Sequence, residues 1–330
     1  MTKRWKFSLA GSLLALLLSS SAMAEEWVYN PAVEESPAPA YAPPACDECC
    51  DCCSKDLLLG FIAPTDTRWA NFISPMTNPV FFEDPRTLTE ARFIFIDHQI
   101  PDLAGGAIPA SKLQVLAVQL RAALTEDLSL IATKDGYIFP TGIAPLDDGW
   151  ADVALGLKYN LWKDVECQRI LSAGVTFELP IGSPQALQGN GSGEFNLFAS
   201  YGAEFGNCNH LITTAGFRLP TDTVDENQIF YWSAHVDQPI GNSRFYAFAE
   251  GNWYHWMKDG GNAAFDGIQG TDLFNFGSTG VAGTDIVTGA LGLKYRPSDL
   301  REIGVAFEVP LTDERGVLQN RLTLDYIIRY

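Results

Sequence analysis

A cluster of five cysteines near the start of the chain is the densest group of residues that could do chemistry. It occupies the run "CDECCDCC" and comprises Cys46, Cys49, Cys50, Cys52 and Cys53. Thiolates beside carboxylates can hold a metal ion, so these cysteines are weak candidate metal ligands. Disulfides are the alternative, and an oxidising compartment favours them. Because five is odd, one cysteine is left to pair between chains or to stay free.

The four histidines, in contrast, form no catalytic pair in the sequence. They begin the tripeptides "HQI", "HLI", "HVD" and "HWM", at His98, His210, His235 and His255. None has a serine two residues away, which is the spacing used by the phospholipase barrel of the outer membrane. His235 and Asp237 can share one face of a strand, but no nucleophile stands beside them. We therefore expect no enzymatic activity and no cofactor.

The first 24 residues predict export from the cytoplasm. Lys3, Arg4 and Lys6 precede the apolar run "FSLAGSLLALLLSSSAMA", which ends in small residues at Ala24. A basic start, a short apolar run and a small-residue cleavage site are typical of a secretory signal peptide. The run is short for a helix that spans ~30 Å of hydrocarbon, and no later stretch is longer. We expect residues 1–24 to be removed.

The charge of the chain argues against a nucleic-acid partner. The formal net charge is −18, and cleavage after Ala24 would remove three basic residues and no acidic one. Binding to the phosphates of nucleic acids needs lysine and arginine on the protein.

Two segments before residue 93 differ in composition from the rest. Residues 25–56 are rich in proline, alanine, acidic residues and cysteine, which predicts a disordered segment in the periplasm. Residues 57–92 contain apolar pieces interrupted by four prolines, which exclude a long helix or a central strand. The sequence leaves open whether this second segment is a plug or a packed arm.

From residue 93 to residue 330 the sequence predicts β-strands throughout. The segments have roughly ten residues and are rich in β-branched and aromatic types. The last one, in "NRLTLDYIIRY", alternates between apolar and polar residues with only Ile327 out of place. We expect twelve strands, at 93–100, 113–124, 128–138, 151–161, 170–180, 194–205, 210–219, 229–238, 245–256, 285–295, 302–310 and 321–330.

The connections between these strands alternate between short and long. An even number of strands, with short turns at one end and longer loops at the other, is typical of a transmembrane antiparallel β-barrel. The last strand then pairs with the first, so that no edge is exposed. A soluble β-sandwich would also alternate, but aromatic residues near the strand ends favour the barrel. Both termini would lie in the periplasm.

The polar faces of the strands would line the interior of such a barrel. Their charges either line an aqueous path or pair across strands and fill a closed interior, because twelve strands lie between the ~8 that side chains can fill and the ~16 of open porins. These lumen-lining candidates are Arg121, Lys158, Glu178, Glu204, Arg218, Asp237, Glu250, Lys294, Glu308, Asp325 and Arg329.

Three finer hypotheses follow from the predicted strands. The sequence "LGLKY" occurs at 155–159 and again at 291–295, and we expect a cross-strand pair of Lys158 with Glu178 and of Lys294 with Glu308. The longest loop, 257–284, either folds inward as a constriction or is a mobile surface loop. In the short turns, we predict a disulfide between Cys167 and Cys208.

The run "GWADVALGLKYNLWKD", with "ILSAGVTFELPIGSP" and "GEFNLFASYGAEFG" after it, resembles outer-membrane proteins grouped under the meta-pathway of phenol degradation. In that group a strand ending in "LGLKY" precedes a strand ending in "ELPIG". The likeness covers about residues 113–330 and implies a barrel that moves small organic solutes without catalytic residues. The segments before residue 93 depart from that group.

Together these patterns predict an all-β protein of the outer membrane of a Gram-negative-type bacterium. Outer-membrane lipid would surround the barrel, and the barrel-assembly machinery would recognise its C-terminal strand. We expect it to pass small solutes, aromatic and other organic molecules among them, by passive diffusion. The alternative is a closed barrel with a structural or adhesive role that displays its loops. The sequence leaves the solute and the oligomeric state open.

Overall fold

The computed structural model describes residues 57–103, 108–142, 145–206 and 208–330. The predictions for the signal peptide, for residues 25–56 and for the five-cysteine cluster lie outside these residues. Within the described ranges, no helix has the length and apolar composition that crossing a membrane requires.

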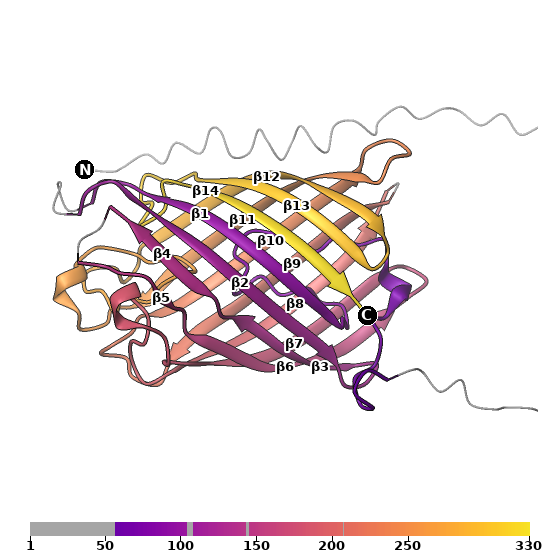
Figure 1. The fold of residues 1–330 in the computed structure, drawn as a ribbon, viewed down its shortest axis with the longest axis horizontal. Helices are drawn as coiled ribbons and strands as arrows, with labels where there is room; N and C mark the ends of the chain where they lie inside the picture. Colours follow the sequence, from indigo (N-terminus) through magenta and orange to yellow (C-terminus); the bar gives the residue numbers. More distant parts are fainter. Residues whose placement is uncertain (1–56, 104–107, 143–144, 207) are drawn as a thin grey trace, which may run out of the picture. The chain divides into compact units, whose positions relative to one another are not determined.

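The described chain forms one closed antiparallel sheet (Figure 1). The strands follow one another around the barrel nearly in chain order, and the first pairs with both the second and the last. They are β1 (Glu90–Ile100), β2 (Ser111–Ala123), β3 (Leu128–Lys134), β4 (Tyr137–Thr141), β5 (Gly149–Trp150), β6 (Val153–Asp164), β7 (Arg169–Leu179), β8 (Glu194–Phe205), β9 (Asn209–Pro220), β10 (Gln228–Pro239), β11 (Phe245–Lys258), β12 (Asp285–Ser298), β13 (Arg301–Pro310) and β14 (Asn320–Arg329).

The barrel has the twelve strands that the sequence predicts. β3 and β4 both pair with β2 and are two parts of one barrel strand, and β5 and β6 are likewise two parts of the next. The predicted strand ends lie within three residues of the observed ones, and two differences stand out. The first strand begins at Glu90 rather than residue 93, and the predicted strand 128–138 is interrupted at Asp135 and Gly136.

The strand sequences place apolar side chains outside and polar side chains inside. On β14, Leu322 and Leu324 are exposed on the outer face, whereas Thr323 and Asp325 are buried. Ile327 shares the inward side and is also buried. An apolar outer face suits hydrocarbon, and a closed sheet pairs the backbone polar groups that lipid cannot satisfy. The alternation of apolar and polar side chains along the strands therefore matches a barrel that lipid surrounds.

The chain ends inside the hydrogen-bonded wall. The backbone N–H of Tyr330 donates to the carbonyl of Thr89, and the carbonyl of Tyr330 accepts from the N–H of Thr65. Pairing of β14 with β1 begins next to this point, between Arg329 and Glu90. The terminal aromatic residue is thus tied to the segment that enters the barrel.

The repeated "LGLKY" motif marks two places where the wall leaves no room for a side chain. A Cβ on Gly156 would overlap the carbonyl oxygen of Val175 on the neighbouring strand, and a Cβ on Gly292 would overlap the ring of Phe248. Glycine inside a strand often marks such a close approach. The glycine of the repeated motif is therefore required for close packing in the barrel wall.

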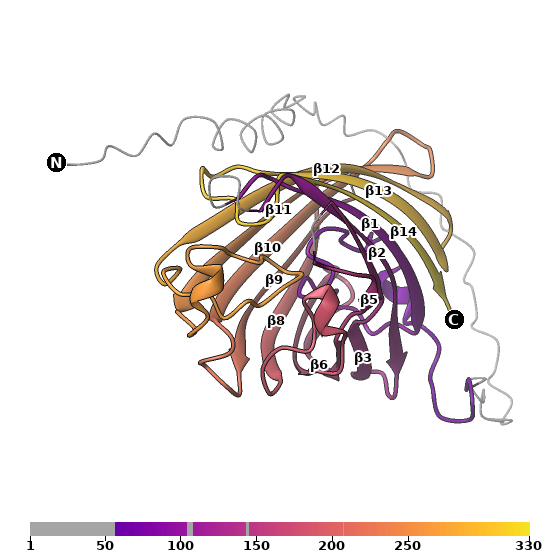
Figure 2. The ribbon, with the colours of Figure 1, turned by 60° about the vertical axis from the view of Figure 1, so that its left-hand side comes forward.

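The segment before β1 lies inside the barrel (Figure 2). We call residues 69–89 the plug segment. From Phe72 through Thr89 every residue is buried, and Trp69 and Phe72 pack against Ile170 and Ile212 of the wall. Residues 69–89 of the predicted segment 57–92 thus lie inside the barrel, whereas Leu57, Leu59 and Phe61 of the same segment are exposed.

The longest loop also turns inward. Its residues Leu273, Phe274 and Phe276 are buried and pack against Ile94 and Val115 on the inner face of β1 and β2. Of the two alternatives for this loop, the structure shows the inward-folded one. The plug segment and this loop together fill much of the interior.

Gly156→Ala should destabilise the barrel, because the added methyl group must push β6 and β7 apart. We expect the free energy of unfolding to fall by about 1–3 kcal/mol, as for other overpacked sites. Urea unfolding in lipid vesicles measures it. Gly251→Ala is the matched control, since the nearest atom to its Cβ would be the Thr288 carbonyl oxygen at 3.8 Å. Equal effects of the two substitutions would contradict this explanation of the motif.

Candidate functional site

The charged residues predicted to line the interior lie on the inner faces of their strands. Two of the eleven, Glu178 and Glu204, are partly exposed. The other nine are buried and comprise Arg121, Lys158, Arg218, Asp237, Glu250, Lys294, Glu308, Asp325 and Arg329. Because a buried charge is costly unless it is paired, the partners of these residues decide whether the interior is open or filled.

The plug segment supplies several of those partners. The Glu83 carboxylate lies 2.6 Å from Nη2 of Arg121 and 2.7 Å from Nζ of Lys158. Next to it in the chain, Asp84 pairs with Arg86 at 2.7 Å within the plug segment itself. All five side chains are almost fully buried. One carboxylate of the plug thus pairs with two cations of the wall, and Arg121 also pairs with Glu90 of β1 at 3.1 Å.

A second group of charges ties β12, β13 and β14 together. Glu302 lies 3.0 Å from Nζ of Lys294 and 2.6 Å from Nη1 of Arg329, and it accepts the backbone N–H of Ser74. Asp325 binds the same lysine and also Arg92. Glu302 is thus another point at which the wall holds the plug segment.

The two cross-strand Lys–Glu pairs predicted from the sequence are wrong. In the register of β6 and β7, Lys158 faces Gly174 and Glu178 faces Ala154, four residues further along. Four residues of strand span ~13 Å, which is beyond the reach of a direct ion pair. Glu178 instead pairs with Lys134. The second copy shows the same offset, with Lys294 opposite Gly304 and Glu308 opposite Ala290.

The remaining sequence candidates do not form a reactive centre in the described residues. Cys167 and Cys208 are exposed free thiols, so the structure does not contain the predicted bond, and their oxidation stays a prediction. Among the described residues, no hydroxyl or thiol is hydrogen-bonded to any of the four histidine rings. In the part of the chain that the structure describes, no group of three His, Cys, Asp or Glu side chains is placed to hold a metal ion.

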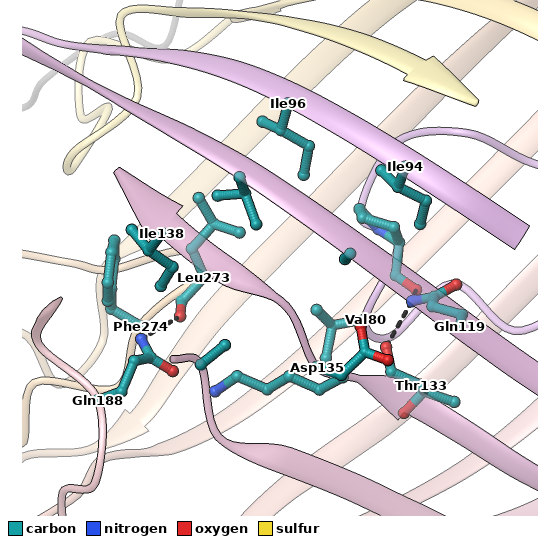
Figure 3. Close-up of a pocket in the computed structure, with 15 residues that line it drawn as sticks. Val80, Ile94, Ile96, Gln119, Thr133, Asp135, Ile138, Gln188, Leu273 and Phe274 are labelled. Carbon is teal, nitrogen blue, oxygen red and sulfur yellow. Dashed lines mark hydrogen bonds between the residues drawn. The ribbon is translucent and has the colours of Figure 1, made fainter. Parts of the chain in front are cut away.

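An apolar cavity of about 40 Å³ lies between the plug segment and the inward loop (Figure 3). Val80 of the plug borders it, and Leu273 and Phe274 of the loop border it from another side. Ile94 and Ile96 contribute the wall of β1. Most of the lining is aliphatic or aromatic, and the volume is room for a few water-sized molecules. The lining of this cavity is thus mostly apolar, in contrast to the ion-paired regions of the interior.

The barrel wall is interrupted beside this cavity. Residues 120–123 of β2 pair with β3, and residues 112–116 of β2 pair with β4. Between them, the N–H of Val118 donates to the carboxylate of Asp135 at 2.9 Å, where a backbone carbonyl would usually accept. Gly136 follows with φ +119°, a conformation that suits glycine. Asp135 also lines the cavity, so the interruption and the cavity adjoin.

Few features of the sequence indicated this site. β1 alternates poorly because its inner face carries Ile94 and Ile96 where other strands carry polar residues. The plug carboxylates Glu83 and Asp84 stand in a proline-broken segment with no periodicity. The mixed polarity of β1 and the Asp135–Gly136 pair, a turn-forming dipeptide inside a predicted strand, were the available signals.

Comparison with solved structures places the fold among outer-membrane barrels. The COG4313 outer membrane channel from Pseudomonas putida F1 aligns over 78% of this chain and 100% of its own, with 14% identity and a TM-score of 0.53. A NanC porin aligns over 73% of this chain and 98% of its own, with 9% identity and a TM-score of 0.45. At these identities the likeness shows the fold alone. No protein family and no curated protein matches the chain, so the likeness to the phenol meta-pathway group stays a prediction.

Glu83→Gln should loosen the plug segment, because it leaves Lys158 buried without the carboxylate that it pairs with and leaves Arg121 with Glu90 alone. Breaking a buried ion pair on one side typically costs about 3–5 kcal/mol. Urea unfolding in lipid vesicles should show a loss of this order. Lys112→Gln is the control, since Lys112 and Asp97 are 3.7 Å apart and part exposed, and such a pair is worth ~0–1 kcal/mol. Similar losses for both would mean that Glu83 does not anchor the plug.

A buried carboxyl in the loop between β9 and β10 should make stability depend on pH. Burial, and then the nearby Glu194 and Glu178, raise the pKa of Glu226 from its ordinary 4.5 to about 8. Between these values the folded state holds a proton that the unfolded chain has lost, so stability should fall as pH rises from about 4.5 to about 8.

Glu226→Gln should reduce that slope, since the amide does not titrate. The measurement is the urea midpoint at pH 5 and pH 8.5, compared between the wild type and the variant. Glu314→Gln, at an exposed position of another loop, is the control and should keep the wild-type slope. A Glu226→Gln slope equal to that of the wild type would refute the assignment.

Proposed function

We propose that this protein is an outer-membrane channel for small apolar organic solutes, with the cavity between the plug segment and the inward loop as its binding site. The observation that carries the proposal is the mostly apolar lining of that cavity, in an interior that elsewhere holds many buried ion pairs. Ile94, Ile96 and Phe274 present hydrocarbon and aromatic surface to a solute there. Pockets for small molecules are typically apolar with a few placed polar groups.

The size of the cavity limits what can occupy it. About 40 Å³ does not admit a six-membered ring while the lining side chains stay where they are. Leu273 and Phe274 lie on a loop rather than on a barrel strand, so they are the side chains that have the most freedom to yield. A ring-sized solute would enter by displacing them.

The remaining features of the proposal follow the pattern of outer-membrane barrels. The long loops would face the outside, and the short turns and both termini would face the periplasm. Lipid would surround the exposed apolar faces, and the barrel-assembly machinery would act on the strand that ends at Tyr330. His210, His235 and His255 lie beside carboxylates, and His98 lies beside the carbonyl of Val317. These surroundings support a protein without enzymatic activity.

A closed barrel with a structural or adhesive role is the second candidate. The observation that favours it is the buried ion-pair network between the plug segment and the wall, centred on Glu83 and Glu302. In that case the charges fill the interior and no solute binds. Solute binding in the cavity distinguishes the two candidates.

Toluene should stabilise the folded barrel if the cavity binds apolar solutes, because a ligand that binds only the folded state raises its stability. In detergent, we expect toluene to raise the temperature at which the barrel unfolds, measured on a gel by the change in mobility of the heated protein. Arabinose should have no effect on that temperature. Val115→Trp, which fills the cavity from β2, should abolish the toluene shift.

Val118→Trp is the matched control, because Val118 is exposed on the outer face of the same strand. It should keep the toluene shift. The absence of any shift in the wild type, together with vesicles that stay tight to sugars, would favour the closed barrel. Vesicles that swell in arabinose would instead indicate an aqueous pore and overturn the apolar-solute proposal.

A further inference from the structure

One carboxylate of the wall binds Met76 and Thr77 of the plug segment, which we call the plug tip. Glu250 on β11 accepts the backbone N–H of Met76 at 2.7 Å and that of Thr77 at 2.6 Å. It also accepts the hydroxyl of Thr77 at 2.5 Å and Nδ1–H of His235 at 2.7 Å. Four donors thus converge on one buried side chain, and three of them belong to the plug.

A chain of ionisable groups runs from this carboxylate across the neighbouring strands. Nε2 of His235 lies 3.2 Å from Asp237, whose other oxygen lies 2.8 Å from Nδ1 of His210. The far nitrogen of His210 is 3.7 Å from Glu204. Glu250, His235, Asp237 and His210 are buried, whereas the Glu204 side chain is 24% exposed. The chain therefore leads from the plug to a side chain that reaches solvent.

The hydrogen bonds of His235 define its charge in this arrangement. An ionised carboxylate only accepts hydrogen bonds, and both ring nitrogens of His235 face carboxylate oxygens. Both nitrogens must therefore carry a proton, which makes His235 an imidazolium between Glu250 and Asp237. Loss of one proton would leave two buried carboxylates without a cation between them, a costly state.

Titratable groups face His235 from three strands. On β10 the group is Asp237, on β11 it is Glu250, and on β9 it is His210, which is reached through Asp237. Phe248 stacks on the ring of His235, with centroids 5.2 Å apart. Tyr246 also interacts electrostatically with Asp237. From the plug segment, only backbone N–H groups and the Thr77 hydroxyl reach Glu250.

We propose that Glu250, His235 and Asp237 form a proton-controlled latch on the plug segment. With His235 protonated, Glu250 stays ionised and holds Met76 and Thr77. When pH rises and His235 loses a proton, the buried negative charge is uncompensated and the plug tip is released. The latch rests on the proposed function in one respect, because Pro79 and Val80, just past Thr77, border the solute cavity. Release of the tip opens that cavity.

Hydrogen–deuterium exchange of the folded protein in detergent tests the latch without any solute. Pulsed labelling between pH 6 and pH 10, corrected for the intrinsic exchange rate, follows a peptide that contains Met76 and Thr77. We expect protection of this peptide to fall at least tenfold across the range in the wild type. His235→Asn should show the low protection at pH 6 already and no step with pH.

His255→Asn is the matched control, because His255 on β11 binds Asp285 and does not touch the plug. It should behave as the wild type. Thr77→Val is a second variant that keeps the ionisable groups, and it should lower protection at pH 6 while the step with pH persists. If His235→Asn does not fold into a barrel, the exchange profiles of the wild type and of Thr77→Val still test the latch.

A wild-type protein with constant protection from pH 6 to pH 10 would overturn the latch, as would a His235→Asn profile equal to that of His255→Asn. The toluene shift measured on the same samples separates the two proposals. A pH step without a toluene shift keeps the latch and removes the solute site. A toluene shift without a pH step removes only the latch.

Discussion

The central constraint of this structure is that many charged side chains are buried in the interior of the barrel. The strands turn their apolar side chains toward lipid, so the polar half of each strand faces inward whether or not water is there. A buried charge must then find an opposite charge or a set of hydrogen-bond donors. Arg121 and Lys158 find Glu83 of the plug segment, and Lys294 and Arg329 find Glu302 of the wall. The plug segment thus supplies part of the negative charge that compensates the buried cations of the barrel.

The same constraint explains where an apolar site can exist. The inner face of β1 carries Ile94 and Ile96 between Arg92 and His98, and there the inward loop supplies Leu273 and Phe274 as apolar partners. The small remaining cavity lies where Pro79 and Val80 of the plug segment meet these two loop residues. The two inserts thus leave a mostly apolar cavity between them.

Several features of the interior were visible as residue types but not as contacts. The alternation placed Lys158 and Glu178 on one inner face, yet the register of β6 and β7 separates them by four residues. Each then finds a partner that sequence spacing could not indicate, Glu83 from the plug and Lys134 from β3. Long-range partners of this kind depend on the path of the segment before β1, which has no periodicity of its own.

The barrel could be predicted from the sequence, because a period of two residues and alternating short and long connections are local properties of the chain. The sequence also predicted which side chains face inward, as the burial along β14 shows. The contacts inside the barrel could not be predicted, and these include the bonds of Glu250 to Met76 and Thr77 and the interruption of the wall at Asp135 beside a cavity. Such contacts join residues far apart, 174 positions between Met76 and Glu250 and 228 between Ser74 and Glu302, and they leave no periodic trace in a sequence.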